Sequence, residues 1–224
     1  MLDAIQNFLA SYGALLAKGT LDTLIMVVIS TLLAYCIGLP LAIIFKLTDP
    51  GSLKPQPVVH AILGWVVNMG RSIPYILLMI ILIPVSHAIT GTSLGVKGAI
   101  VPLAIAAAPF VTRIVEGSFS ELPFGRVEAA LAFGASTLQV VWKVYLKESL
   151  PALVRGAAIT IITLVGYSAI SGALGAGGIG DVAIRYGYYR YQNSVMIATL
   201  VILIIIVQII QSCFDLVARR IDKR

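Results

Sequence analysis

The amino-acid sequence predicts an all-α protein that crosses a membrane several times. Of its 224 residues, 59% are hydrophobic and 12% are charged, and the mean hydropathy is +0.99. A soluble domain of this length cannot bury so much apolar surface, because its exterior must face water. The apolar residues form long unbroken runs, whereas strands of a membrane barrel would give alternating segments of about ten residues. The composition therefore excludes a soluble enzyme, a nucleic-acid-binding domain and a disordered chain.

The apolar runs predict five membrane-spanning helices. A helix needs about 20 apolar residues to cross a hydrocarbon layer about 30 Å thick. The first expected span contains Gly38-Leu39-Pro40 near its far end, where we expect a kink. No cleavable signal peptide is expected before it, because residues 1–18 lack a basic segment followed by an apolar one. The expected spans are residues 21–45, 68–89, 98–115, 153–174 and 194–217.

The apolar run from Val58 to Ile89 is too long for one straight span, and Arg71 interrupts it. Residues 58–70 are expected to form either a helix in the membrane interface or the tilted start of the second span. Both arrangements place Arg71 near the cytoplasmic boundary, where its long side chain reaches polar surroundings.

The basic residues predict an N-terminus outside the cytoplasm and a C-terminus inside it. Five spans place the termini on opposite sides, and cytoplasmic segments carry an excess of Lys and Arg. In this orientation 11 of the 16 basic residues flank the cytoplasmic face. These eleven are Lys46, Lys54, Arg113, Arg126, Lys143, Lys147, Arg155, Arg219, Arg220, Lys223 and Arg224.

The polar segment 116–151, between the third and fourth spans, is expected to form a helical elbow on the cytoplasmic side. Gly134 suits the left-handed conformation that ends a helix. Ser136 and Gln139 match a capping box that starts the next one. Such an elbow either packs on itself or offers a surface to a partner. Apolar residues recur around it at spacings of three and four, namely Val127, Leu131, Leu138, Val141, Trp142 and Tyr145.

The run Glu128-Ala129-Ala130, followed by Gly134, resembles the EAA loop of ABC-importer permease subunits. The segment 121–125 that leads into it is similar as well. The family's loop commonly closes with Leu-Pro, but Lys147 follows Leu146 here and a Leu150-Pro151 pair comes later. This departure leaves the end of the second helix open.

Further segments are similar to the permease subunit of bacterial methionine ABC importers. The likeness extends from about residue 20 to residue 220 and is carried by residues 71–75, 91–93, 107–110 and 164–188. It implies one transmembrane domain over residues 1–224, with a type I importer permease fold, in a bacterial inner membrane. It also implies a homodimer that transports methionine (L or D, and derivatives) by alternating access. Small residues would permit close helix contacts in such a dimer, namely Ala104, Ala108, Gly166 and Gly172.

The resemblance implies that the elbow couples the permease to a separate ATPase. Glu128, Ala129, Ala130 and Gly134 would contact two ATPase subunits, which bind ATP and magnesium. Glu128 has a second interpretation, as an acid favoured near a helix N-terminus. The chain itself has no phosphate-binding GxxxxGK[ST] motif, so we expect no cofactor in it and no enzymatic activity. The other implied partners are a second copy, a substrate-binding lipoprotein outside, methionine and the lipid bilayer, with no nucleic acid.

Polar and sulfur-containing side chains in the spans are candidates for the translocation pathway. An amino acid zwitterion needs polar partners at low dielectric, and a thioether suits a soft apolar surface. Two other interpretations stay open: span hydroxyls often bond a carbonyl of their own helix, and Arg71 can be an interface anchor. The candidates are Met69, Arg71, Ser72, Met79, Thr160, Thr163, Tyr167 and Ser168.

Residues 175–180 read GxGxxG, the pattern of dinucleotide-binding folds. That motif works only between a strand and a helix, and here it follows an apolar span. We therefore expect a glycine-rich turn on the outer side, which lets backbones approach closely. His60 and His87 stand alone, so no metal site is expected.

Three other functional classes remain open. A secondary transporter would show related halves and acids inside the spans, and the sequence has neither. A membrane anchor for a cytoplasmic partner and an ABC permease for another small substrate are the other two.

Overall fold

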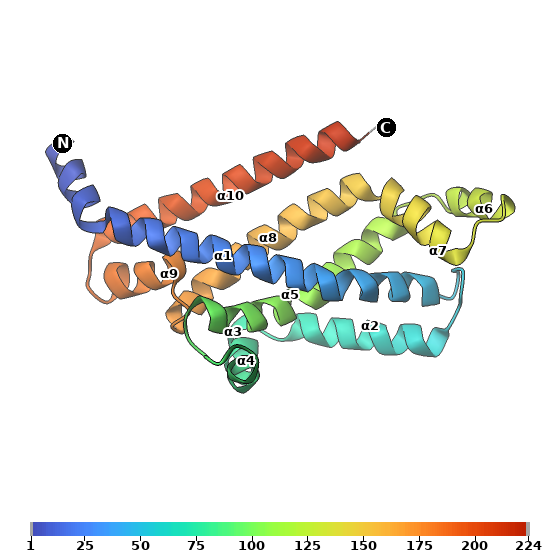
Figure 1. Cartoon of the computed structure of the whole chain (residues 1–224), viewed down its shortest axis with the longest axis horizontal. Coiled ribbons are helices and arrows are strands. Elements are labelled where there is room, and N and C mark those ends of the chain that lie inside the picture. Colours follow the sequence, from blue (N-terminus) through green and yellow to red (C-terminus); the bar gives the residue numbers. More distant parts are fainter. Residues whose placement is uncertain (1, 223–224) are drawn as a thin grey trace. The chain divides into compact units, whose positions relative to one another are not determined.

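The computed structural model describes residues 2–222, and that part of the chain contains helices and no strand. The all-α prediction is therefore confirmed. Figure 1 shows the helices in chain order, and η1 and η2 are short π-helical segments. The elements are α1 Leu2–Thr48, α2 Pro57–Ser72, α3 Tyr75–Ile81, α4 Ile83–Thr90, α5 Gly95–Ser120, α6 Phe124–Ala132, α7 Thr137–Val140, η1 Val141–Leu146, α8 Leu150–Ala173, α9 Gly178–Val182, η2 Ala183–Tyr188 and α10 Asn193–Ile221.

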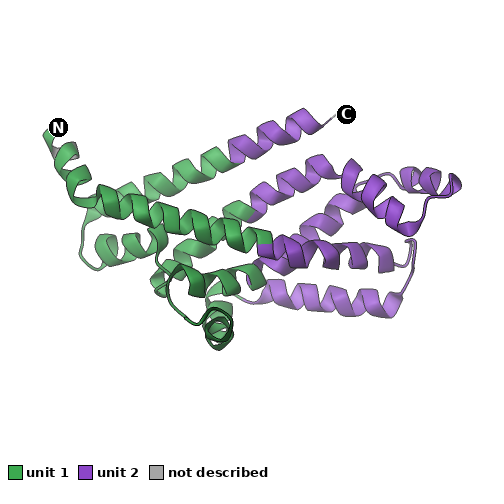
Figure 2. Ribbon diagram, in the orientation of Figure 1, with its two compact units in different colours: residues 1–32, 74–105, 161–210 green, residues 33–73, 106–160, 211–224 purple. Residues whose placement is uncertain are grey.

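The chain divides into two compact units, which Figure 2 colours separately. Unit 1 comprises residues 1–32, 74–105 and 161–210, and unit 2 comprises residues 33–73, 106–160 and 211–224. Helices α1, α5, α8 and α10 each contribute residues to both units.

Four helices in the described part of the chain are long and apolar enough to cross a membrane. They are residues Gln6–Thr48 of α1, together with α5, α8 and α10. The pair formed by α2 and α3 gives a fifth candidate if it is counted as one broken span. The prediction of a polytopic membrane protein with about five spans is thus confirmed.

Helix α1 begins at Leu2, well before the expected start near residue 21. Its first turns are helical because an apolar stripe there, with Tyr12 and Leu16, packs on the core of unit 1. The helix also continues through Pro40. Within unit 2, a Cβ on Gly38 would lie 2.8 Å from the carbonyl oxygen of Ala108, so this glycine lets α1 approach α5 closely.

The expected second span, residues 68–89, is not one helix. Helix α2 takes in residues 58–70 and ends at Ser72, and Ile73 is extended, with φ −79° and ψ 123°. Pro74 follows, and proline disfavours a helical conformation in the residue before it. A second break at Leu82 precedes α4, whose first turn contains Pro84. The two prolines explain why hydropathy alone gave the wrong boundary.

The glycine-rich segment after α8 forms a tight turn in unit 1, and this confirms the sequence prediction of close backbone approach. A Cβ on Gly180 would lie 2.4 Å from the carbonyl oxygen of Ala169. Gly178 has φ +79°, and the next backbone N–H, that of Ile179, donates to Thr23 Oγ1 at 2.8 Å. Ile179 is fully buried in the core of this unit with Leu16 and Val195. The turn therefore seats α9 against the first helix, an element that the hydropathy pattern did not predict.

Candidate functional site

The elbow between α5 and α8 has the local geometry that its sequence predicts. Helix α6 ends at Ala132; Gly134, two residues later, has φ +79°, and its N–H donates to the Leu131 carbonyl oxygen at 2.8 Å. Ser136 then caps α7: its N–H donates to Gln139 Oε1 at 2.8 Å, and its hydroxyl accepts from the Gln139 N–H at 3.4 Å. The chain thus leaves one helix and enters the next within four residues, Phe133 to Ser136.

The second helix of the elbow continues past the position where the family pattern has a proline. Helix α7 passes into η1, and the chain stays helical through Lys147 and Glu148. A turn at Ser149 separates this helix from α8, whose first turn contains Pro151. The later Leu150-Pro151 pair therefore begins the next span.

An apolar layer in unit 2 supports the elbow from within. Val127, Val141 and Tyr145 are all less than 5% exposed, and the Tyr145 ring packs on Phe119 with centroids 5.4 Å apart. Burial, and to a smaller degree the Asp49 carboxylate, raise the pKa of the Tyr145 hydroxyl. This layer holds the two arms of the elbow through their inward-facing residues.

The outer face of the elbow leaves large apolar side chains in contact with solvent. Phe133 is 92% exposed, Leu138 is 66% exposed and Trp142 is 63% exposed. Exposed apolar clusters of this kind are typical of surfaces that bind another protein. A hollow of about 330 Å³ lies beside them and is lined by Ala130, Phe133, Gly134, Ala135, Gln139, Lys143 and Val144. Of the sequence candidates, Ala130 and Gly134 line this hollow, and Glu128 and Ala129 are exposed near it on α6.

Glu128 is the fifth residue of α6 and therefore lies outside the first turn, which has no acidic residue. The helix macrodipole acts mainly within the first turn, so it does little for this carboxylate. Glu128 also forms no ion pair with any residue that the structure describes.

The pathway candidates fall into both units. Met69, Arg71 and Ser72 are exposed on α2 in unit 2, and Thr160 is buried in the same unit. The Ser72 hydroxyl donates to the Asn68 carbonyl oxygen at 2.8 Å, and the Thr160 hydroxyl donates to that of Gly156 at 2.9 Å. Both hydroxyls are thus satisfied within their own helices.

Met79, Thr163, Tyr167 and Ser168 belong to unit 1, where two of them meet at Tyr75. The Tyr75 and Tyr167 rings are stacked, with centroids 4.4 Å apart and an interplanar angle of 1°. The Tyr75 hydroxyl lies 3.5 Å from Met79 Sδ and is hydrogen-bonded to the Ser171 hydroxyl. Ser168 bonds the Val165 carbonyl oxygen of its own helix, and Thr163 is half-buried.

Sequence reasoning left Tyr75 out of the candidate set. Tyr75 is the first residue of α3, directly after the break at Pro74. The break itself was the available signal, since a proline inside an apolar run ends a helix and marks irregular backbone at membrane depth.

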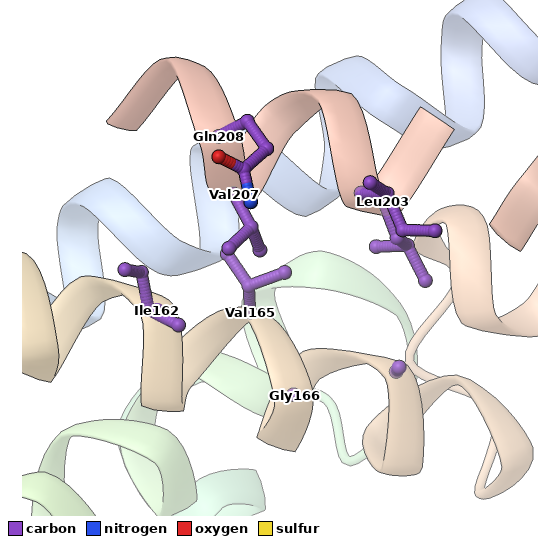
Figure 3. Close-up of a pocket in the computed structure, with 8 residues that line it drawn as sticks. Ile162, Val165, Gly166, Leu203, Val207 and Gln208 are labelled. Atoms are coloured by element: carbon purple, nitrogen blue, oxygen red, sulfur yellow. The ribbon is translucent and has the colours of Figure 1, made fainter. Parts of the chain in front are cut away.

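A second hollow lies in unit 1 between α8 and α10 (Figure 3). It measures about 290 Å³ and is almost entirely apolar. Gly166 leaves space in its floor, because no atom lies within 4 Å of a Cβ built there. Gln208 supplies its one amide side chain, which has no hydrogen-bond partner among the described residues. The other lining residues are Ile162, Val165, Ala169, Leu203, Ile204 and Val207.

Comparison with known proteins identifies the family. Residues 37–224 match the model of the binding-protein-dependent transport system inner membrane component family. The chain belongs to this family. One relative, a probable D-methionine transport system permease protein from Vibrio cholerae, is 46% identical over 99% of both chains. A relative of the same name from Pasteurella multocida is 41% identical over 94% of this chain and 97% of its own.

Solved structures agree with this membership. This chain is similar to a chain of the MetNI methionine ABC transporter in an inward-facing conformation, with a TM-score of 0.94 and 43% identity. That match covers 95% of this chain and 99% of the other. An amino acid ABC transporter solved with histidines shares the fold, with a TM-score of 0.77 at 18% identity over 95% of this chain and 96% of that one.

Proposed function

We propose that the chain is the membrane permease subunit of an ATP-driven ABC importer for methionine, in its L or D form. The observation that carries this proposal is the 46% identity, over 99% of both chains, to a relative named as a D-methionine transport permease. The TM-score of 0.94 to the methionine ABC transporter supports it independently. A separate ATPase subunit, with ATP and magnesium, would supply the energy.

The outer face of the elbow is the proposed docking surface for that ATPase. The side chains of Ala129 and Ala130 are small, so a partner can approach the backbone of α6 closely. Glu128 has no ion pair with a described residue to break and would meet a basic or donor group of the partner. Gly134 shapes the hollow in which a partner side chain would lie.

The proposed orientation places this surface in the cytoplasm, with the N-terminus outside. The support is the concentration of basic residues near the elbow and the end of α10, among them Lys143, Lys147 and Arg219. Lys223 and Arg224, which contribute to the same count, lie outside the described residues.

A second copy of the chain would complete the pathway, and the hollow between α8 and α10 is the face we propose for it. Gln208 sits near the middle of an apolar span, where an unsatisfied amide costs several kcal/mol. A lipid tail cannot satisfy that amide, whereas a second protein chain can. Gly166 and Ala169 would allow another helix to approach closely.

The two copies would work by alternating access. ATP-driven closure of the ATPase pair would draw the two elbows together and tilt the spans, so that the pathway opens to a binding protein outside. The cycle advances only because ATP favours one state over the other. We propose Tyr75, Tyr167 and Met79, which contact one another in unit 1, as lining residues, with Met69, Arg71 and Thr163 as further candidates. The hydroxyls of Ser72, Thr160 and Ser168 are satisfied locally and would contribute less.

Uptake into vesicles tests the function directly. The chain is reconstituted with its ATPase and binding protein, and labelled methionine is followed with and without ATP. We expect uptake that requires ATP and is unaffected by an ionophore. Uptake that persists without ATP and collapses with an ionophore would instead identify a secondary transporter.

A further inference from the structure

Segments of unit 2 that are far apart in the sequence line a charged cavity at the base of the elbow. They are the start of α6, the end of the elbow's second helix together with the start of α8, and the residues at the end of α10. The cavity measures about 340 Å³ and is lined by Arg126, Lys147, Glu148, Leu150, Pro151, Ile221 and Asp222. We call this group the basal junction.

Two ion pairs involve residues of the basal junction. Arg126, in the first turn of α6, contacts the Glu148 carboxylate through its guanidinium Nη1, across 22 residues of sequence. Arg155, in α8, contacts Asp222 at the end of α10 at 3.3 Å, across 67 residues. Only the first pair involves the helix that carries Glu128.

Glu148 is a firm anchor because the residue after it is fixed. Ser149 is 2% exposed, and its hydroxyl donates to the Ser118 carbonyl oxygen of α5 at 2.9 Å. Helix α6, by contrast, is short and is bounded by the turn before Pro123 and the corner at Gly134. The Arg126–Glu148 pair is thus a polar tie between a short helix with turns at both ends and the residue that precedes the turn into α8.

The pair is poorly placed to stabilise the fold. Its two side chains are 41% and 42% exposed, and exposed ion pairs contribute little to stability. What the pair does provide is orientation, since it links the first turn of α6 to Glu148, two residues before α8 begins.

We propose that Arg126 and Glu148 form a clamp that makes α6 move together with the first turns of α8, so that displacement of the elbow reaches the span. Both are positioning residues, and the inference rests on the proposed function. Without the clamp, α6 would swivel on its two turns, and ATP hydrolysis would proceed with less transport.

The test measures ATP hydrolysed per methionine imported, in vesicles that contain the permease, its ATPase and its binding protein. We compare R126E, E148R, the swapped pair R126E/E148R and the neutral pair R126Q/E148Q. Lys147→Gln is the matched control, because Lys147 lines the same cavity but forms no ion pair with a described residue. The first two variants and the neutral pair should raise the ratio about fivefold, within the range by which coupling residues act. The swapped pair and the control should stay near the wild-type ratio.

A neutral pair that couples as well as wild type overturns the clamp, and so does a swapped pair as uncoupled as the single variants. If the single variants do not assemble with the ATPase, the ratios measured for the neutral and swapped pairs still test the clamp. A wild-type protein that shows no ATP-dependent uptake would refute the proposed function instead, which keeps the two failures distinguishable.

Discussion

Replacing Gly134 tests whether the elbow depends on a left-handed backbone at its corner. The residue has φ +79°, and no heavy atom lies within 4 Å of a Cβ built on it. A side chain there meets no clash, so its cost is the conformational penalty alone. That penalty is about 1–2 kcal/mol for an ordinary residue and smaller for asparagine. We expect the free energy of unfolding to fall by about 1–2 kcal/mol in Gly134→Ala, by less in Gly134→Asn and by up to about 3 kcal/mol in Gly134→Val.

Two measurements separate the effect of Gly134 on the backbone of the elbow from its effect on contact with the ATPase. The first is the unfolding of the purified permease alone in detergent, which reports the backbone penalty. The second is ATP-dependent uptake in vesicles, which we expect to fall in the same order, Asn, Ala, Val. Gly125→Ala is the matched control, because Gly125 lies in the first turn of α6, in open space and without a positive φ. It should lose no stability and keep normal uptake.

Equal destabilisation by asparagine and valine would refute the backbone argument, since only valine is strongly excluded from this conformation. Loss of uptake in Gly134→Asn with unchanged stability would point to the size of the side chain at the ATPase contact.

Three further predictions concern local structure. Ser136→Ala removes the cap of α7 and should lower the free energy of unfolding by about 1 kcal/mol, measured by thermal unfolding. Gly180→Ala places a Cβ 2.4 Å from the Ala169 carbonyl oxygen, so we expect almost no folded protein in the membrane fraction, whereas Gly117→Ala, in open space, should accumulate normally. Because the folded pKa of Tyr145 is raised, its contribution to stability is complete below its unfolded pKa of about 10 and is lost as the pH rises through the folded value. Stability should therefore fall above pH 10 in the wild type and fall less in Tyr145→Phe, measured by unfolding across this pH range.

Local signals in the sequence were sufficient for the elbow and the glycine turn. Gly134, Ser136 and Gln139 act on neighbours within a few residues, so their positions alone predicted the corner and the cap. Gly180 was likewise recognisable as part of a close backbone approach, because several glycines lie near one another in this segment of the sequence.

Helix boundaries failed where packing or proline outweighed hydropathy. The start of α1 lies in a segment of mixed polarity that becomes helical by packing Tyr12 and Leu16 against Ile179, more than a hundred residues away in sequence. Pro74 was visible in the sequence, but the residues on both sides of it are apolar, so hydropathy indicated one continuous span.

Contacts between distant segments had no sequence signal. Tyr75 and Ser171 are 96 residues apart, and the Ser171 hydroxyl also bonds a carbonyl oxygen of its own helix, as those of Ser72 and Thr160 do. Such a pair is defined only when two helices have been packed.

The basal junction shows why even short separations can escape sequence reasoning. Arg126 and Glu148 lie in the same loop, which also carries Glu128 as a possible partner of Arg126, and Lys143 and Lys147 as possible partners of Glu148. A regular helix through residues 137–148 would predict one set of facing side chains. The structure instead inserts η1, and a π-helical segment has a wider turn that shifts the direction of every side chain after it. Which charge Arg126 meets therefore depends on a backbone irregularity with no reliable signature in sequence. Because π-helical irregularities recur at functional sites, this one also supports a role in coupling for the pair whose register it sets.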